Sequence, residues 1–349
     1  MTTILRVTLL SAATLLFTVV SALPNTALAG PGSDKQDFVF FGDSLSDTGN
    51  RYFDEGAMNT PPYDLAAAEN LIPSLPYAIG GPTYTNGKVW IEYVATALGR
   101  SGASQAALRS NGIAANYAYS GARASNLYPL QPNSNRNLGD QVVQYIADKG
   151  PGGISPDTVH VILIGGNDIS EAVFIAGTVQ DADLRDMLVN LVLQNAIEAV
   201  FFNASELANA GAERFLLLTA PNAGYVPVFG GDPLAIFFSG QITDFFNCAI
   251  VGINANFECP LPELPFTVAG ALTAAGAEVR VFDANGLFEN FVFYPEVYGL
   301  TNTTDHCIKP FEPPFRCDNP DEYLFWDNVH PTGKVHELIG NAVIDALSN

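Results

Sequence analysis

The chain has 349 residues, 48% of them hydrophobic, and a formal net charge of −21. This apolar content is enough for a sizeable core and excludes a globally disordered protein. The length fits one large α/β domain or two smaller ones. Because so acidic a surface repels phosphate groups, we expect no nucleic-acid partner.

The first 29 residues have the pattern of a secretory signal peptide. Arg6 gives a positive start, residues 7–20 are almost entirely apolar, and Ala27-Leu28-Ala29 fits the small-x-small cleavage rule. The apolar run is short for a membrane span, so an uncleaved anchor is the weaker alternative, and no later stretch reads as a transmembrane helix. We therefore expect a secreted protein, periplasmic or extracellular, with one mature domain over residues 30–349.

The first predicted strand of this domain is an apolar run that ends at a glycine. Residues 38–41 read FVFF, and Gly42 follows them. Small polar residues come next, beginning with Asp43 and Ser44 at the mouth of an expected helix. The carboxyl edge of a parallel sheet is where open α/β folds build their sites, so Ser44 is a candidate nucleophile. The alternative is that Asp43-Ser44 only caps a helix.

Short apolar strands alternate with helices along the rest of the chain. Residues 50–84 show no clear period and are interpreted as a long surface excursion, a possible wall of a substrate cleft. Further strands are predicted at 114–119, 158–164, 214–218 and 278–282, and helices at 90–98, 138–147, 183–210, from 234 within 227–265, at 266–275 and at 332–347. This alternation predicts a parallel sheet with helices on both faces, in one domain.

All four cysteines lie in the last third of the chain. They are Cys248, Cys259, Cys307 and Cys317. Behind an export signal, two disulfides are the natural interpretation, and of the three possible pairings we favour the local one, Cys248–Cys259 and Cys307–Cys317. A metal site is a weak alternative, because neither pair has C-x-x-C spacing and only His306 is nearby.

Three predicted strands end in residues that ester cleavage requires. Ser44 follows the first strand, Gly121 the second and Asn167 the third. The carboxyl ends of parallel strands share one edge, so these residues are expected close together. A nucleophilic serine needs a base and donors for the oxyanion that forms. The Asn167 side chain and the backbone N–H groups of Gly121 and Ser44 can be those donors.

The base must be a histidine, and His330 fits best. It lies in a Pro-bounded loop three residues after Asp327, a spacing that lets the carboxylate reach Nδ1 and leaves Nε2 free for a serine. The alternative is that Asp327 simply precedes a turn. The other histidines are His160 inside the buried third strand, His306 beside Cys307, and His336, expected on the surface of the last helix.

Four ordered motifs resemble the GDSL lipases and esterases, also called SGNH hydrolases. They are GDSLSDTGN at 42–50, NYAYSGA at 116–122, GND at 166–168 and WDNVHPT at 326–332. One of them alone would be weak evidence, but all four occur in the family's order and cover almost the whole mature chain. The segments 85–90, 281–283 and 298–302 also look similar to the family.

The resemblance implies a flavodoxin-like three-layer α/β/α fold with a five-stranded parallel sheet. It makes Ser44 the nucleophile, Asp327 the residue that orients His330, and His330 the general base and then acid. Gly121 and Asn167, with the Ser44 N–H, would form the oxyanion hole. It implies a small-molecule or lipid ester as substrate and no metal or organic cofactor, and we expect a monomer.

Three alternatives remain open at this point. A phospholipase or a carbohydrate deacetylase would use the same chemistry. A catalytically inactive binding or adhesion protein could keep the same scaffold, although the intact Ser44, Asn167, Asp327 and His330 set argues against it. A nucleotide-binding flavodoxin-like module would need a glycine-rich phosphate loop, and the loop after the first strand lacks that pattern.

A Phe-rich segment between 229 and 266 has two interpretations. It is either an acyl-binding lid or a helix packed against the core, because exposed aromatic surface and buried core share this composition. Its aromatic residues are Phe229, Phe237, Phe238, Phe245, Phe246, Phe257 and Phe266.

Overall fold

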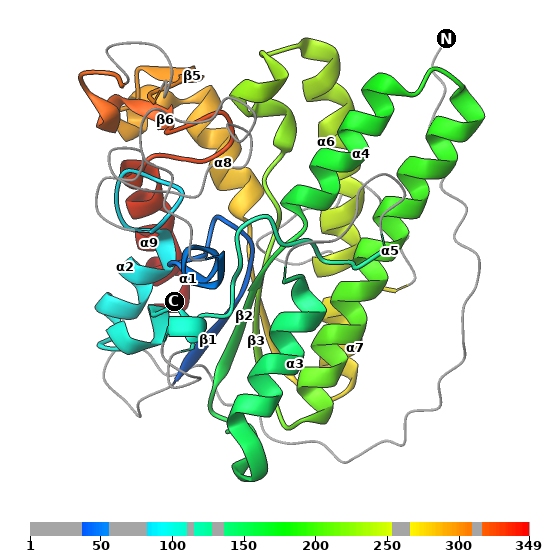
Figure 1. Ribbon diagram of the computed structural model, residues 1–349, viewed down its shortest axis with the longest axis vertical. Helices are drawn as coiled ribbons and strands as arrows, with labels where there is room; N and C mark the ends of the chain where they lie inside the picture. Colours follow the sequence, from blue (N-terminus) through cyan, green and yellow to red (C-terminus); the bar gives the residue numbers. More distant parts are fainter. Residues whose placement is uncertain are drawn as a thin grey trace.

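The computed structural model describes residues 37–55, 82–109, 115–127, 136–252, 266–308 and 316–348. The expected signal peptide, most of the expected surface excursion, and Cys259 lie outside the described residues. At the centre is a parallel sheet in the order β1-β2-β3-β4 (Figure 1). Its strands are β1 (Phe38–Gly42), β2 (Val159–Leu163), β3 (Arg214–Leu218) and β4 (Glu278–Phe282). They coincide with four of the predicted strands and confirm the α/β class.

The remaining predicted strand, at residues 114–119, is present only as an irregular edge. Residues 115–119 run along β1, where the Tyr117 N–H donates to the Phe40 carbonyl at 2.8 Å. Only Asn116 forms a bridge to β1, so the regular sheet of the described ranges has four strands rather than five. On its other side, Asn116 pairs with the backbone of residues 105–107, and its carbonyl also accepts from the Asn50 amide at 2.8 Å. The segment still lies where a flavodoxin-like strand order requires it.

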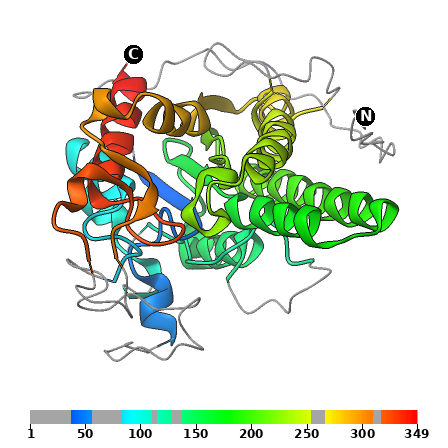
Figure 2. The same ribbon diagram turned by 90° about the horizontal axis from the view of Figure 1, so that it is seen from above.

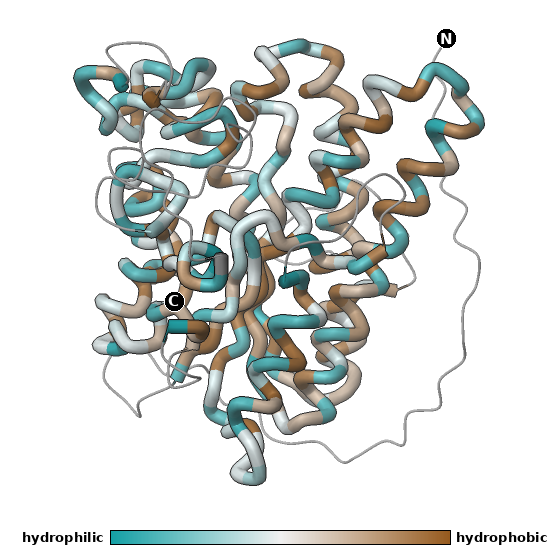
Figure 3. Tube along the Cα trace, in the orientation of Figure 1, coloured by the Kyte–Doolittle hydropathy of each residue, from teal (hydrophilic) through white to brown (hydrophobic). Residues whose placement is uncertain are grey.

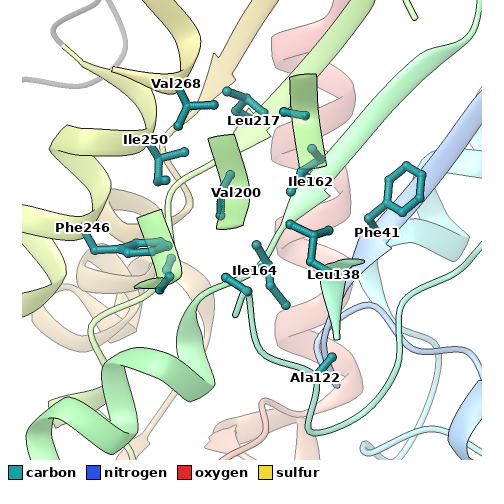
Figure 4. Packing of buried hydrophobic residues seen from close by; sticks show 14 of the residues in the cluster. Phe41, Ala122, Leu138, Ile162, Ile164, Val200, Leu217, Phe246, Ile250 and Val268 are labelled. Carbon is teal, nitrogen blue, oxygen red and sulfur yellow. The ribbon is translucent and has the colours of Figure 1, made fainter. Parts of the chain in front are cut away.

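Helices cover both faces of the sheet. This is required because successive side chains of each buried strand point to opposite faces. Phe40 and Val161 point to the face covered by α2 (Trp90–Ala97) and α9 (Gly333–Ser348). Phe41 and Ile162 point to the opposite face (Figure 4). That face is covered by α3 (Leu138–Lys149), α4 (Gly166–Thr178), α5 (Ala182–Asn209), α6 (Pro233–Val251) and α7 (Val268–Ala274). Seen from above, α9 and α5 lie on opposite sides of the strands (Figure 2).

Three helices were not predicted. The first is the short α1 (Asn50–Glu55), at the start of the expected excursion. The second is α4, which begins on a glycine pair, and the third is α8 (Ala284–Phe293), which is rich in aromatic residues of low helix propensity. Tertiary packing accounts for α8, because Phe288 and Phe291 are buried in a cluster with Phe325.

Two described helices, α5 and α6, are long and apolar enough to cross a membrane by length and composition alone. Both pack within the fold, and Val192, Ala196 and Val200 of α5 belong to the core cluster. The central strands form a hydrophobic stretch of the trace, whereas hydrophobic and hydrophilic residues alternate along the helices (Figure 3). Each helix therefore buries one face in the core and leaves apolar side chains such as Phe202 and Phe237 exposed on the other.

The Phe-rich segment is divided between core and surface. Phe246, in the second half of α6, is 1% exposed and packs in the core. Phe237 and Phe238, near the start of the helix, are 58% and 45% exposed. The core interpretation therefore holds for one half of α6, and the other half presents aromatic side chains to solvent.

A small second sheet lies beside the last helix. It pairs β5 (Asn302–His306) with β6 (Tyr323–Phe325) in parallel. A disulfide joins Cys307 to Cys317, which is one of the two expected pairings and rules out a metal site on that pair. Trp326 is buried against this disulfide, so the crosslinked segment packs directly against the residue before Asp327.

Candidate active site

Ser44 lies on a tight turn at the end of β1. Gly42, two residues before Ser44, must be glycine, because a Cβ atom on residue 42 would lie 2.3 Å from the Leu163 carbonyl oxygen. The turn is closed by the Asp47 N–H, which donates to the Asp43 carbonyl at 3.0 Å. The expectation that Ser44 lies at the mouth of a helix is wrong, since α1 begins six residues later at Asn50.

Ser44, His330 and Asp327 form a continuous hydrogen-bonded line. The Ser44 Oγ lies 2.7 Å from His330 Nε2, and His330 Nδ1 lies 2.7 Å from Asp327 Oδ2. The other Asp327 oxygen accepts the backbone N–H groups of Val329 and His330, at 2.8 and 2.6 Å. One carboxylate therefore fixes both the loop backbone and the imidazole ring.

The loop that carries His330 is held from two sides. Within the loop, the Trp326 N–H donates to the His330 carbonyl at 2.7 Å, as in a hairpin. From outside, the Thr85 hydroxyl donates to the Pro331 carbonyl at 2.9 Å. The ring of Tyr84 packs on the imidazole with centroids 5.0 Å apart. The segment before α2 therefore braces a loop that lies 246 residues away in sequence.

Asn167 lies in the first turn of α4, directly after β2. Gly165 precedes this helix with φ of 115°. The ring of Phe246 lies where the Gly165 Cβ would stand, at 2.4 Å, so only glycine fits. The Asn167 Nδ2 donates to the Ala122 carbonyl at 2.8 Å. An amide nitrogen carries two N–H groups, so a second donor remains for another acceptor.

Gly121 is held next to the Ser44 turn by a buried carboxylate. Asp47 Oδ2 accepts from the N–H of Ser120 at 2.9 Å and from its hydroxyl at 2.8 Å. The other oxygen of Asp47 accepts the N–H groups of Gly49 and Asn50, at 2.7 and 2.6 Å. The two segments that carry Ser44 and Gly121 are therefore joined through Asp47.

Three buried aspartates lie around this edge of the sheet. Burial raises the pKa of Asp43 to about 6, against the opposing effects of the Leu45 N–H and of nearby His330. Burial likewise raises the pKa of Asp168 to about 7, and it raises the pKa of Asp47. Asp43 Oδ2 would lie 3.5 Å from a Cβ on Gly166, which places the Ser44 turn against the start of α4.

Two of the remaining histidines are buried away from Ser44 Oγ. His160 bonds to the Tyr145 hydroxyl and the Arg214 carbonyl, both at 3.2 Å, as expected of a satisfied core histidine. Burial lowers its pKa to about 4. His336 is 1% exposed, so the expectation that it lies on the surface of the last helix is wrong. Burial and nearby His330 lower the pKa of His336 to about 3.

Sequence reasoning missed the residues that position the site. Asp47 lies inside the first motif, and its position there was the only available signal. Thr85 begins the family-like segment 85–90, but nothing in the sequence indicated that it bonds to the His330 loop, and nothing indicated Tyr84. No group of three or more His, Cys, Asp or Glu side chains suited to a metal ion occurs in the described ranges.

The chain is similar to known lipases and esterases over most of its length. The model of the GDSL-like Lipase/Acylhydrolase family matches residues 38–343. The thermolabile hemolysin of Vibrio parahaemolyticus serotype O3:K6 is 24% identical over 329 residues, which cover 89% of this chain but 63% of the hemolysin. GDSL esterase/lipase 6 of Arabidopsis thaliana is 22% identical over 373 residues, covering 96% of this chain and 93% of that protein.

Among solved structures, Axe2, an acetylxylan esterase from Geobacillus stearothermophilus, aligns with a TM-score of 0.40 and 15% identity, covering 92% of this chain and 96% of that one. The family match includes the turn of Ser44, the start of α4 and the loop of His330. The chain therefore belongs to the GDSL-like lipase/acylhydrolase family and is a carboxylic ester hydrolase.

Proposed function

We propose that the protein is an exported serine esterase or lipase that cleaves carboxylic esters through an acyl-enzyme on Ser44. The observation that carries the proposal is the line Asp327–His330–Ser44, with both bonds at 2.7 Å. A histidine held by a carboxylate on Nδ1 presents Nε2 as a base to the serine, which is the arrangement that activates a hydroxyl nucleophile.

In the first half-reaction, Ser44 Oγ attacks the ester carbonyl carbon while His330 Nε2 takes the hydroxyl proton. The carbonyl oxygen becomes an oxyanion, for which the second N–H of the Asn167 amide and the backbone N–H groups of Gly121 and Ser44 are the donors. Collapse of this intermediate breaks the ester C–O bond, and His330 returns the proton to the leaving alcohol.

In the second half-reaction, water replaces the alcohol. His330 removes a proton from the water, the resulting hydroxide attacks the acyl carbon, and the same donors hold the second oxyanion. The carboxylic acid leaves, and His330 returns the proton to Ser44 Oγ. Asp327 stays ionised throughout and stabilises the imidazolium formed in each half-reaction.

Export is the second part of the proposal. It rests on the pattern of residues 1–29 and on the disulfide between Cys307 and Cys317, a crosslink typical of proteins that leave the cytosol. The curated relatives named as esterase/lipase support ester hydrolysis in general.

The test is hydrolysis of p-nitrophenyl esters from acetyl to palmitoyl by the protein without residues 1–29. The wild type is compared with Ser44→Ala and His330→Ala, and Ser205→Ala in α5 is the matched control for loss of a serine hydroxyl. Hydrolysis that disappears in the first two variants and persists in the control supports the proposal, and the chain-length profile separates an esterase from a lipase.

Robust turnover in folded His330→Ala would assign the base to another histidine. Retention of activity in Ser44→Ala would overturn the acyl-enzyme mechanism. No cleavage of any ester by the folded wild type would point first to a narrow natural substrate and then to an inactive binding scaffold.

A further inference from the structure

The loop after Gly121 is joined to the first two turns of α4 at three successive residues. The Ala122 carbonyl accepts from the Asn167 side chain at 2.8 Å. The Arg123 guanidinium pairs with the Glu171 carboxylate. The Ala124 N–H donates to Asp168 Oδ2 at 2.9 Å. Every one of these contacts connects the segment that carries one proposed oxyanion donor with the helix that carries the other.

The ion pair at the centre of this joint is largely desolvated. The side chains of Arg123 and Glu171 are 16% and 5% exposed. Two further carboxylate oxygens, Asp168 Oδ1 and Glu171 Oε1, are buried without a hydrogen-bond partner among the described residues. A pair removed from water is screened little by solvent or salt, so it constrains geometry more than an exposed pair does.

Helical geometry links Glu171 to Asn167. The two residues are four positions apart in α4, so their side chains lie one above the other on one face of the helix. Arg123 therefore bonds to the same face from which Asn167 points toward the loop. Gly121 is fixed independently, because Asp47 holds its neighbour Ser120 through two hydrogen bonds.

We propose that Glu171, paired with Arg123, is a positioning residue that sets the separation between the Asn167 amide and the Gly121 N–H in the oxyanion hole. This inference rests on the proposed function of Ser44 and Asn167. Oxyanion donors act only when they meet the oxygen at hydrogen-bond distance, and a displacement of about 1 Å costs roughly 10²-fold in rate. The contacts that keep the loop after Gly121 from shifting relative to α4 therefore contribute to kcat.

The test is Glu171→Gln, which keeps the shape of the side chain and removes its charge. We expect kcat for p-nitrophenyl acetate to fall by about tenfold or more with KM within about twofold, because the loss falls on the transition state rather than on ester binding. Glu337→Gln, which breaks the exposed Lys334–Glu337 pair of α9, is the matched control and should leave kcat unchanged.

A double-mutant cycle with Asn167→Ala separates positioning from general loss of stability. If Glu171 acts through Asn167, Glu171→Gln lowers kcat by less than about twofold once Asn167 is already alanine, since the donor that it positions is gone. Equal losses in both backgrounds would overturn the proposal, as would an unchanged kcat in Glu171→Gln itself. If Asn167→Ala is as inactive as Ser44→Ala, ester hydrolysis cannot measure the effect of Glu171→Gln in that background. The rate at which a p-nitrophenyl phosphonate phosphonylates Ser44 is then measured in all four proteins of the cycle.

If Glu171→Gln does not fold, Arg123→Lys takes its place in the same cycle. Lysine keeps the charge but loses the planar fork that fixes the direction of the pair. Failure of the proposed function would be visible separately, as activity that survives in Ser44→Ala.

Discussion

Asp47 Oδ2 accepts two hydrogen bonds from Ser120, one from the backbone N–H at 2.9 Å and one from the hydroxyl at 2.8 Å. These bonds join two segments that lie 73 residues apart in sequence. The first carries Ser44, the proposed nucleophile, and the second carries Gly121, a proposed oxyanion donor. One buried carboxylate thus joins the segment of the proposed nucleophile to the segment of a proposed oxyanion donor.

We predict that Asp47→Asn lowers both stability and kcat. An amide replaces one of the two accepting oxygens by a donor, so several buried N–H groups lose their partner, at about 1–3 kcal/mol for each unsatisfied group. Ser120 and Gly121 are then free to shift. Urea unfolding and ester hydrolysis measure the two effects, and a variant that is destabilised but fully active would show that Asp47 supports the fold alone.

We predict that Asp327→Asn lowers kcat by roughly 10⁴-fold while KM changes little. Asp327 bonds to His330 Nδ1 with one oxygen and to two backbone N–H groups with the other. The amide of asparagine has one accepting oxygen, so it can accept either from the backbone N–H groups or from His330 Nδ1, but not from both. The imidazole then loses the tautomer that presents a basic Nε2 to Ser44. In a serine protease this defect lowers kcat by about the same factor. Steady-state kinetics on a soluble ester checks it, and a loss below about tenfold would exclude Asp327 from orienting the base.

We predict that Asn167→Ala lowers kcat by ~10²–10³ with the fold intact, the usual loss for one oxyanion donor. Its side chain also bonds to the Ala122 carbonyl at 2.8 Å, so a modest decrease in melting temperature should accompany the loss. Circular dichroism and kinetics on the same preparation separate the two effects. A change in kcat under about threefold would remove Asn167 from the oxyanion hole.

We predict that Gly165→Ala is strongly destabilising and that it acts through two separate causes. Its φ of 115° disfavours any Cβ, and the Phe246 ring occupies the place of that atom. Adding Phe246→Leu should relieve the steric part but not the backbone strain. Urea unfolding of the single and double variants is the measurement, and additive losses would show that the ring does not press on this position.

We predict that the burial of neutral His336 lowers the free energy of unfolding as the pH falls. Its folded pKa of about 3 lies below the ordinary value of 6.5. Below pH 6.5 the unfolded chain binds a proton at this side chain that the folded chain does not bind until about pH 3. The contribution of neutral His336 is therefore complete above pH 6.5, and it is lost at about 1.4 kcal/mol for each pH unit as the pH falls through that window.

The measurement is the free energy of unfolding of wild type and His336→Leu at pH 7.5, 5.5 and 4.5. The difference between the two proteins should shift in favour of the variant by about 2–3 kcal/mol from pH 7.5 to 4.5. Asp43 and Asp168, whose raised pKa values act in the opposite direction, are common to both proteins and cancel in the difference. A difference that does not change with pH would show that His336 is not buried in the neutral form.

Elements that depend on local pattern can be predicted from the order of the amino acids. The central strands are short apolar runs that a parallel sheet buries on both faces, so β1 to β4 were found from composition and spacing. The helices α2, α3, α5, α7 and α9 follow from helical periodicity. Asp327 and His330 are three residues apart in one loop, so their contact is almost a local property. The ordered motifs then indicated Ser44, Gly121 and Asn167 as their counterparts.

Features that depend on residues far apart in the chain are visible only in the folded protein. His336 shares its helix with polar neighbours, and its burial arises from elements that pack on α9 from elsewhere. Helix α8 exists because its aromatic side chains meet Phe325, and Asn116 is held by residues 105–107 and by the Asn50 side chain. The Asp47–Ser120 and Arg123–Glu171 contacts join segments more than 45 residues apart. No local propensity encodes such contacts, because each one forms only once the sheet has brought its strand ends to one edge.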